Sequence, residues 1–222
     1  MKKWGKISIA AALGVLFLAL IAIVKWVDVA AIGPEGTSVG LSHLNGAVAS
    51  ALGFQETWYK ITKLTGYVAF AVIAAFAVLG GWQLISRKSL AKVDRKLLFL
   101  AGLYVVTAVL YVVFEKVVIN YRPVIVPGDA GPEASFPSTH TMLAVVVFGS
   151  ALLLLPDYLA DRRLLLGARC VVCALLLVTV IGRLLSGVHW LTDILGGILL
   201  GAFLLAAFRL FTEQMHPNKL KR

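Results

Sequence analysis

Three residues near the carboxyl end of the 222-residue sequence, Arg183, His189 and Asp193, could do chemistry together. Arg183 and Asp193 lie inside apolar stretches, where an ionisable side chain costs free energy and marks a functional site by default. His189 and Asp193 are four residues apart, so they share one helix face if a helix extends back to His189. An aspartate one turn from a histidine can orient the imidazole and fix its tautomer. The other ring nitrogen is then free to act as a nucleophile.

A second set of polar residues, Lys116, Arg122, Ser138 and His140, lies between residues 115 and 140. His140 stands where a helix is predicted to start, and the free backbone N–H groups of a helix N-terminus bind anions. Two arginines, a lysine, a hydroxyl and these N–H groups could converge on one oxyanion between two histidines. That set suits phosphoryl transfer, in which one histidine attacks phosphorus and the other protonates the leaving oxygen.

Each of these residues also has a structural interpretation of its own. Arg183 or Arg122 could extend to lipid headgroups. His140 could be a hydrogen-bonded histidine at the membrane interface, and Asp193 could form an ion pair with Arg183. Their joint occurrence on one side of the membrane favours the chemical interpretation.

The composition predicts that a membrane positions these residues. The chain is 60% hydrophobic and 14% charged, whereas a soluble domain is about half apolar and about a quarter charged. A mean hydropathy of +0.91 agrees. The net charge of +10 would raise nucleic acid as a partner, but the basic residues are spread between apolar stretches. We therefore expect one membrane domain over residues 1–222, with membrane lipids and no nucleic acid as partners.

Six stretches are long enough to cross the hydrocarbon core as helices, which takes about 20 residues each. We expect an all-α, polytopic six-transmembrane-helix bundle, with spans at 7–24, 64–86, 97–114, 141–156, 170–188 and 190–208. No convincing cleavage site precedes Asp28, so the first span is expected to be retained rather than removed as a signal peptide. Gly197 and Gly201 form a small-x-x-x-small pair, which predicts close packing of the sixth helix.

The distribution of positive charge predicts the orientation. Fifteen of the 21 lysines and arginines precede the first span, follow the sixth, or lie between the second and third or the fourth and fifth spans. Six spans place all these segments on one side, which the positive-inside rule assigns to the cytoplasm. Both termini are then cytoplasmic. Residues 28–63, residues 115–140 and the turn around His189 face outward, so the site is expected at the outer face of the cell membrane.

The same residues resemble the three signatures of the type 2 phosphatidic acid phosphatase superfamily. RLLSGVHWLTD (183–193) is similar to the third signature, in which five residues separate an arginine from a histidine and three separate that histidine from an aspartate. PSTH (137–140) resembles the second signature, Pro-Ser-Gly-His, and NYRP (120–123) resembles the end of the first. The motifs follow the family order within residues 115–201. A membrane-embedded chain of this kind is similar to the lipid-phosphatase branch.

The resemblance implies a role for each matching residue. His189 would form a phosphohistidine intermediate, Asp193 would orient it, and His140 would protonate the leaving group. The phosphate oxygens would be bound by Arg122, Arg183, Ser138 and the backbone near Thr139 and His140. The family works without a metal, so neither a metal nor another cofactor is implied.

Two positions depart from the family pattern. The first signature places a lysine seven residues before the arginine, and Glu115 stands there, with Lys116 six residues before Arg122. Lys116 enters the site only if the chain bulges locally. An ionised Glu115 would repel phosphate or meet a cationic headgroup. Thr139 replaces the usual glycine, so the backbone beside the phosphate is less free.

We therefore expect a phosphatase for a lipid phosphate or diphosphate, of the undecaprenyl diphosphate, phosphatidylglycerol phosphate or phosphatidic acid class. A non-catalytic lipid-binding or scaffold protein on the same fold is the alternative, and Glu115 favours it. A small transporter or channel is a third interpretation, but the charged residues gather at one face instead of lining the spans. The choice of lipid and the oligomeric state stay open at this stage.

Overall fold

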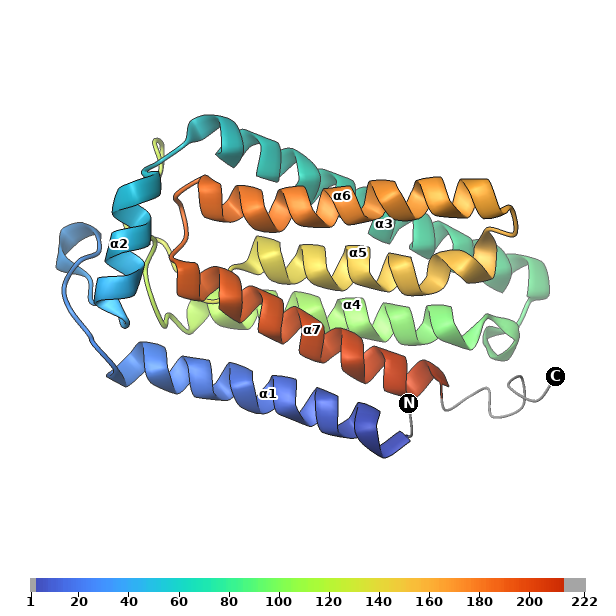
Figure 1. Ribbon diagram of the computed structural model, residues 1–222. Helices are drawn as coiled ribbons and strands as arrows, with labels where there is room; N and C mark the ends of the chain where they lie inside the picture. Colours follow the sequence, from blue (N-terminus) through green and yellow to red (C-terminus); the bar gives the residue numbers. More distant parts are fainter. Residues whose placement is uncertain (1–2, 214–222) are drawn as a thin grey trace.

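The computed structural model describes residues 3–213, and within them seven α-helices form a bundle without β-strands (Figure 1). Six of the helices are long and apolar enough to cross a membrane, which confirms the predicted fold class. These are α1 (Lys3–Trp26), α3 (Glu56–Arg87), α4 (Arg95–Lys116), α5 (Thr139–Tyr158), α6 (Arg162–Leu185) and α7 (Leu191–Glu213). The seventh, α2 (Ser42–Leu52), is short.

Helix α5 lies in the middle of the bundle and packs against α3, α4, α6 and α7, while α1 packs on the far side of α7. The short helix α2 lies at one end, across the ends of the long helices (Figure 1). The loop from α4 to α5 and the turn from α6 to α7 reach that same end. The start of α1 and the end of α7 lie at the opposite end, as an even number of spans requires.

Two predicted helix boundaries were wrong by two turns. Helix α3 begins at Glu56 rather than near residue 64, and α6 begins at Arg162 rather than at residue 170. The sequence windows detected only the apolar part of each helix, whereas both helices continue into polar sequence. Asp161 caps α6, since its carboxylate accepts the backbone N–H groups of Arg163 and Leu164 at 2.8 and 2.9 Å. The earlier start of α3 carries its first two turns alongside the candidate site.

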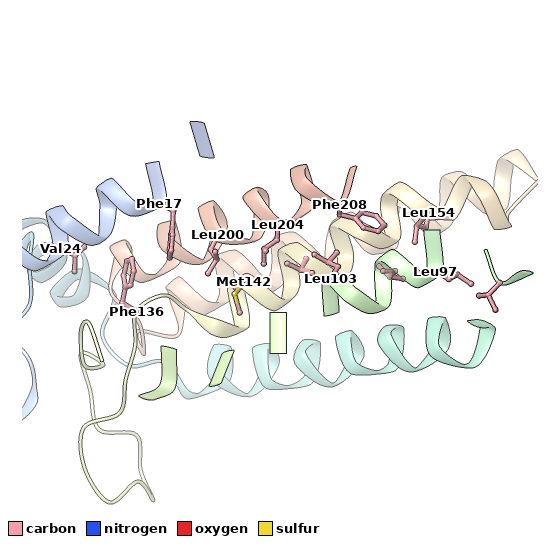
Figure 2. Close-up of a cluster of buried hydrophobic side chains, with 13 residues drawn as sticks. Phe17, Val24, Leu97, Leu103, Phe136, Met142, Leu154, Leu200, Leu204 and Phe208 are labelled. Atoms are coloured by element: carbon pink, nitrogen blue, oxygen red, sulfur yellow. The ribbon is translucent and has the colours of Figure 1, made fainter. Parts of the chain in front are cut away.

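Phe136 anchors the loop that leads into α5. Its ring stacks on Phe17 of α1 with 6.1 Å between centroids, and Phe114 of α4 meets Phe17 edge-on at 6.0 Å. Figure 2 shows Phe136 at one end of the cluster of buried hydrophobic side chains that runs along the bundle. A Cβ at Gly196 of α7 would lie 2.8 Å from the Phe136 ring, so the glycine makes room for it. Phe136 therefore fixes the chain directly before the PSTH motif.

The glycines of α7 let that helix approach α5 closely. A Cβ at Gly197 would lie 2.7 Å from the carbonyl oxygen of Ser138, and one at Gly201 would lie 2.8 Å from Val145. The predicted close packing of the sixth span is confirmed. It holds the start of α5, with His140, beside the start of α7, with Asp193.

Candidate active site

His189 lies in the turn between α6 and α7 and is only 5% exposed. Its Nε2 is 2.9 Å from Nη2 of Arg183. A guanidinium only donates hydrogen bonds, so Nε2 accepts this one and the ring proton belongs on Nδ1. Nδ1 faces Oδ2 of Asp193 at 3.5 Å. The imidazole is thus held between a cation and an anion, in the tautomer whose lone pair is on Nε2 and accepts the Arg183 hydrogen bond.

The predicted pairing of His189 with Asp193 is present, although α7 does not extend back to the histidine. The helix begins at Leu191, and Oδ2 of Asp193 accepts the backbone N–H of Trp190 at 2.9 Å. Asp193 therefore caps its own helix and closes the turn back towards His189. The side chains of Asn120 and Ser135 face the same carboxylate. Neither was predicted as a partner of Asp193, although Asn120 begins the NYRP motif, because single polar residues in a loop carry no periodic signal.

The surroundings of His189 keep its ring neutral. Burial, followed by the charges of Arg183, Arg122 and His140, lowers the pKa of His189 well below the ordinary value of 6.5, against a smaller opposing effect of the Ser135 backbone. A neutral imidazole is the nucleophilic form. The site therefore keeps Nε2 unprotonated at neutral pH.

His189 and His140 line one cavity of about 410 Å³. His140 is the second residue of α5, and its ring lies beside Gly66 of α3, where a Cβ would be 3.5 Å from Cδ2. The cavity is also lined by the side chains of Tyr111, Glu115, Lys116, Arg122, Glu133 and Thr139. Most of the predicted site residues therefore share one chamber, although they come from separate parts of the sequence.

Arg122 lines the cavity from the α4–α5 loop. Its Nη1 pairs with Glu133 at 2.7 Å and lies 3.9 Å from Asp129, and its backbone N–H donates to the Glu133 carbonyl at 2.9 Å. The indole N–H of Trp190 donates to the carbonyl of Tyr121 at 2.6 Å. The loop that holds Arg122 is thereby tied to the residue beside His189.

The other predicted phosphate ligands differ in their positions. Thr139 and Lys116 line the cavity, with Glu115 beside Lys116, so both first-motif candidates reach it. Ser138 is fully buried as the cap of α5, and its Oγ bonds the N–H and the hydroxyl of Thr141 at 3.4 and 3.0 Å. A phosphate contact by Ser138 stays a prediction. The structure gives its hydroxyl a positioning role at the helix N-terminus.

Arg183 is fully buried behind His189 and contacts α3. Its Nη1 is 3.4 Å from Oγ1 of Thr62, and its Cζ lies 5.6 Å from the centre of the Tyr59 ring. Sequence reasoning missed these two residues because it placed them in a loop before the second span. The signal was their spacing with Gly66, which puts all three on one face of a helix.

Helix α2 supports the His189 turn from outside. The amide of the fully buried Asn45 donates to the Gly40 carbonyl at 2.8 Å and to the Thr192 hydroxyl at 3.0 Å. Its oxygen accepts the Thr192 backbone N–H at 3.2 Å. Asn45 thus satisfies one of the free N–H groups at the start of α7. No motif had pointed to it.

These groups can perform nucleophilic substitution at phosphorus. A neutral imidazole offers Nε2, a buried carboxylate can balance the charge that the ring gains, and two arginines can neutralise phosphate oxygens. A second imidazole on the same cavity can donate and accept a proton. Among residues 3–213, no three His, Cys, Asp or Glu side chains gather closely enough to hold a metal ion.

Comparison with known proteins adds a family and a fold. The model of the PAP2 superfamily matches residues 96–216, which include all three motifs. A transmembrane PAP2-type phosphatidylglycerolphosphate phosphatase from Bacillus subtilis has a similar fold, with a TM-score of 0.67 at 21% identity over 95% of this chain and 98% of that chain. No curated protein sequence matches this chain. The family match leaves α1, α2 and α3 outside it.

Proposed function

This chain belongs to the PAP2 superfamily, and from that premise we propose that it is a membrane phosphatase that hydrolyses a lipid phosphate or diphosphate through a phosphohistidine at His189. The observation that carries the proposal is the shared cavity of His189 and His140, with Arg122 at its wall. One imidazole is fixed as a nucleophile by Arg183 and Asp193. The His140 imidazole lines the same cavity and can exchange a proton with the bound substrate.

In the first step, Nε2 of His189 attacks the phosphorus atom. The new N–P bond forms as the P–O bond to the leaving group breaks, and His140 gives its proton to the leaving oxygen. The imidazole of His189 becomes cationic, and the Asp193 carboxylate on the Nδ1 side stabilises that charge. Arg183 and Arg122 bind the phosphoryl oxygens. To do so, the Arg183 guanidinium turns from Nε2 to the phosphate that replaces it there.

In the second step, water attacks the phosphohistidine. His140, now neutral, accepts a proton from the water as its oxygen bonds to phosphorus, and the N–P bond breaks. His189 regains its lone pair, and inorganic phosphate leaves. Neither step requires a metal ion to hold or activate a group, so we propose a metal-independent reaction.

The substrate is proposed to be a lipid because the cavity lies at the end of six membrane-spanning helices and combines charged with apolar walls. Phe114, Val118 and Phe136 line it together with Arg122 and Lys116. A headgroup can be bound by the charged side while its acyl or prenyl chain stays in the membrane. The Bacillus subtilis protein of similar fold is described as acting on a lipid of this kind.

Phosphate release from a panel of lipid phosphates and diphosphates, measured in detergent with EDTA, tests the proposal. The wild type is expected to release phosphate from at least one lipid, and His189→Ala is expected to abolish release. Activity that disappears with EDTA would overturn the metal-independent mechanism. A folded wild type without activity on any lipid would favour the non-catalytic lipid-binding alternative.

The proposed orientation, with both termini cytoplasmic and the site at the outer face, has its own test. Cys170 and Cys173 are both exposed and are first replaced by alanine. Gly131→Cys then places a thiol in the α4–α5 loop, where a side chain has open space, and Ser89→Cys places one in the α3–α4 loop. An impermeant reagent on intact cells is expected to label only the first. Labelling of only the second would invert the topology.

A further inference from the structure

A groove opens at the end of the bundle opposite the candidate site. Helix α7 forms its floor, and α1 and α5 form its walls, because both pack on α7 but make little contact with each other. Its volume is about 340 Å³, within the usual range of ligand pockets, roughly 300–1,000 Å³. It combines apolar side chains with two basic ones, and its lining includes Ile9, Leu153, Leu205, Leu210, Lys6 and Arg209.

The groove is charged at one end and apolar along the rest. Lys6 lies close to the start of α1 and Arg209 close to the end of α7, so both basic side chains are at the same end (Figure 1). Ile9 and Leu205 lie about one turn deeper in the bundle on the same helices. Ile9 and Leu153 are 47% and 37% exposed, so the apolar part is open to the surrounding hydrocarbon. A charged end at the surface and an apolar channel leading inward match the shape of a phospholipid.

The charged end has more positive than negative charge. Nζ of Lys6 and Nε of Arg209 both donate to the carboxylate of Glu213, the second at 2.7 Å, so one carboxylate orients two cations. The sequence has no other acidic residue after position 193, and α1 contains none. Within residues 3–213, the Arg209 Nη groups make no hydrogen bond, and Lys6 Nζ makes none besides that to Glu213. These N–H groups can bind an anionic oxygen.

Two other cavities on the helices show that the basic lining is specific to this groove. The cavity between α3 and α4 and the cavity between α4 and α7 have volumes of about 350 and 300 Å³, and no charged residue lines either. Basic pockets between membrane-spanning helices bind the headgroups of anionic lipids, whereas a purely apolar cavity does not distinguish one headgroup from another. Of the three, only the groove with Lys6 and Arg209 can select a lipid by its charge.

We propose that the groove between α1, α5 and α7 binds an anionic phospholipid of the leaflet opposite the candidate site. Its phosphate accepts hydrogen bonds from Arg209 and Lys6, and one acyl chain lies over Leu205 between Ile9 and Leu153. The lipid fills the space between α1 and α5. It thereby holds α1, which lies outside the family match, against the helices that carry the motifs. The lipid is not a substrate, and this inference does not depend on the proposed function.

Native mass spectrometry of the detergent-purified protein, with equal amounts of dioleoyl phosphatidylglycerol and dioleoyl phosphatidylcholine, tests the headgroup preference. The wild type is expected to retain phosphatidylglycerol preferentially. Arg209→Gln and Lys6→Gln are each expected to lower that preference about fivefold, the attraction of one basic residue for anionic lipid. Lys92→Gln is the matched control, because Lys92 is exposed at the same end of the bundle but does not line the groove. An equal loss in Lys92→Gln, or no preference in the wild type, would overturn the proposal.

Three further variants test where the lipid binds. Ala206→Phe places a ring in the groove, whereas Ala207→Phe places one in the apolar cavity between α4 and α7. Only Ala206→Phe is expected to abolish the preferential retention, and Tm in detergent checks that both variants are folded. Arg122→Gln removes a guanidinium from the candidate site and is expected to retain the lipid as the wild type does. Retention at the wild-type level in Ala206→Phe, or loss in Arg122→Gln, would place the lipid elsewhere and contradict the proposal.

Discussion

Replacing Gly187 with alanine should disable the enzyme through a single methyl group that touches no substrate. Gly187 lies two residues before His189 with φ +68°, and its Cβ would be 1.9 Å from the carbonyl oxygen of Gly53. Real Cβ contacts do not fall below 3.0 Å, so the backbones at residues 187 and 53 must separate by about 1 Å. A misplacement of that size at a catalytic group costs about 100-fold in rate. The Gln55 N–H donates to the Ser186 carbonyl at 3.0 Å and opposes that separation. The left-handed φ adds about 1–2 kcal/mol of strain.

Phosphate release from the best lipid substrate, together with Tm in detergent, measures this effect. Gly36→Ala is the control, because Gly36 also has a positive φ, +74°, but nothing lies within 4 Å of its Cβ position. Both variants should lose a few degrees of Tm, at about 2–4 °C per kcal/mol for a chain of this size, and only Gly187→Ala should lose activity. A Gly187→Ala protein with kcat within about threefold of the wild type would refute the argument that the turn has no room to move.

Three further predictions concern the same end of the bundle. Because its pKa is lowered, the His189 imidazole should stay neutral at pH 5.5 in the substrate-free protein. ¹⁵N NMR measures this, with the His189 ring signals assigned by their absence in the His189→Asn variant. A titration of these signals with a midpoint near pH 6.5 would contradict the burial argument. The unfolded chain takes up that proton near its ordinary pKa of about 6.5, so His189 makes the free energy of unfolding fall as the pH drops below that value. Asn45→Leu should lower stability by at least about 2 kcal/mol, since it leaves the Thr192 N–H and the Gly40 carbonyl without partners; an unchanged Tm would show that water replaces the amide. Lys116→Ala should raise KM or lower kcat markedly if Lys116 binds phosphate across the cavity, and near-normal kinetics would remove it from the site.

The sequence predicted which motif residues come together better than it predicted the helices and loops that surround them. The family resemblance and the bundle of six spans are confirmed, and His189, His140 and Arg122 do line one cavity. These residues could be recognised because ionisable groups stand out in apolar sequence and because their spacing follows a motif. Their individual catalytic roles stay predictions until the variants are measured.

The residues that sequence reasoning missed are those through which neighbouring helices and loops contact the site. Tyr59 and Thr62 were assigned to a loop because hydropathy windows detect the part of a helix inside the hydrocarbon core, and α3 extends beyond it. Asn45 carries no local signal, since its value comes from a hydrogen bond to Thr192, 147 residues away. Asp161 did carry a signal, because aspartate is a preferred N-cap residue and the apolar residues 164–166 begin three positions after it. Recognising that cap would have placed the start of α6 correctly.

The resting hydrogen bond between Arg183 and His189 has a consequence for affinity. A charged hydrogen bond contributes about 1.5–3 kcal/mol, and in the proposed mechanism the 2.9 Å contact is broken before phosphate reaches Nε2. Every phosphate ligand therefore competes with the protein's own imidazole for the guanidinium, which weakens ground-state binding by roughly 10- to 150-fold relative to a site with Arg183 already turned away. The same competition acts on the product. As inorganic phosphate dissociates, the imidazole again accepts the hydrogen bond from Arg183. The contact that weakens substrate binding therefore also weakens product binding and limits product inhibition.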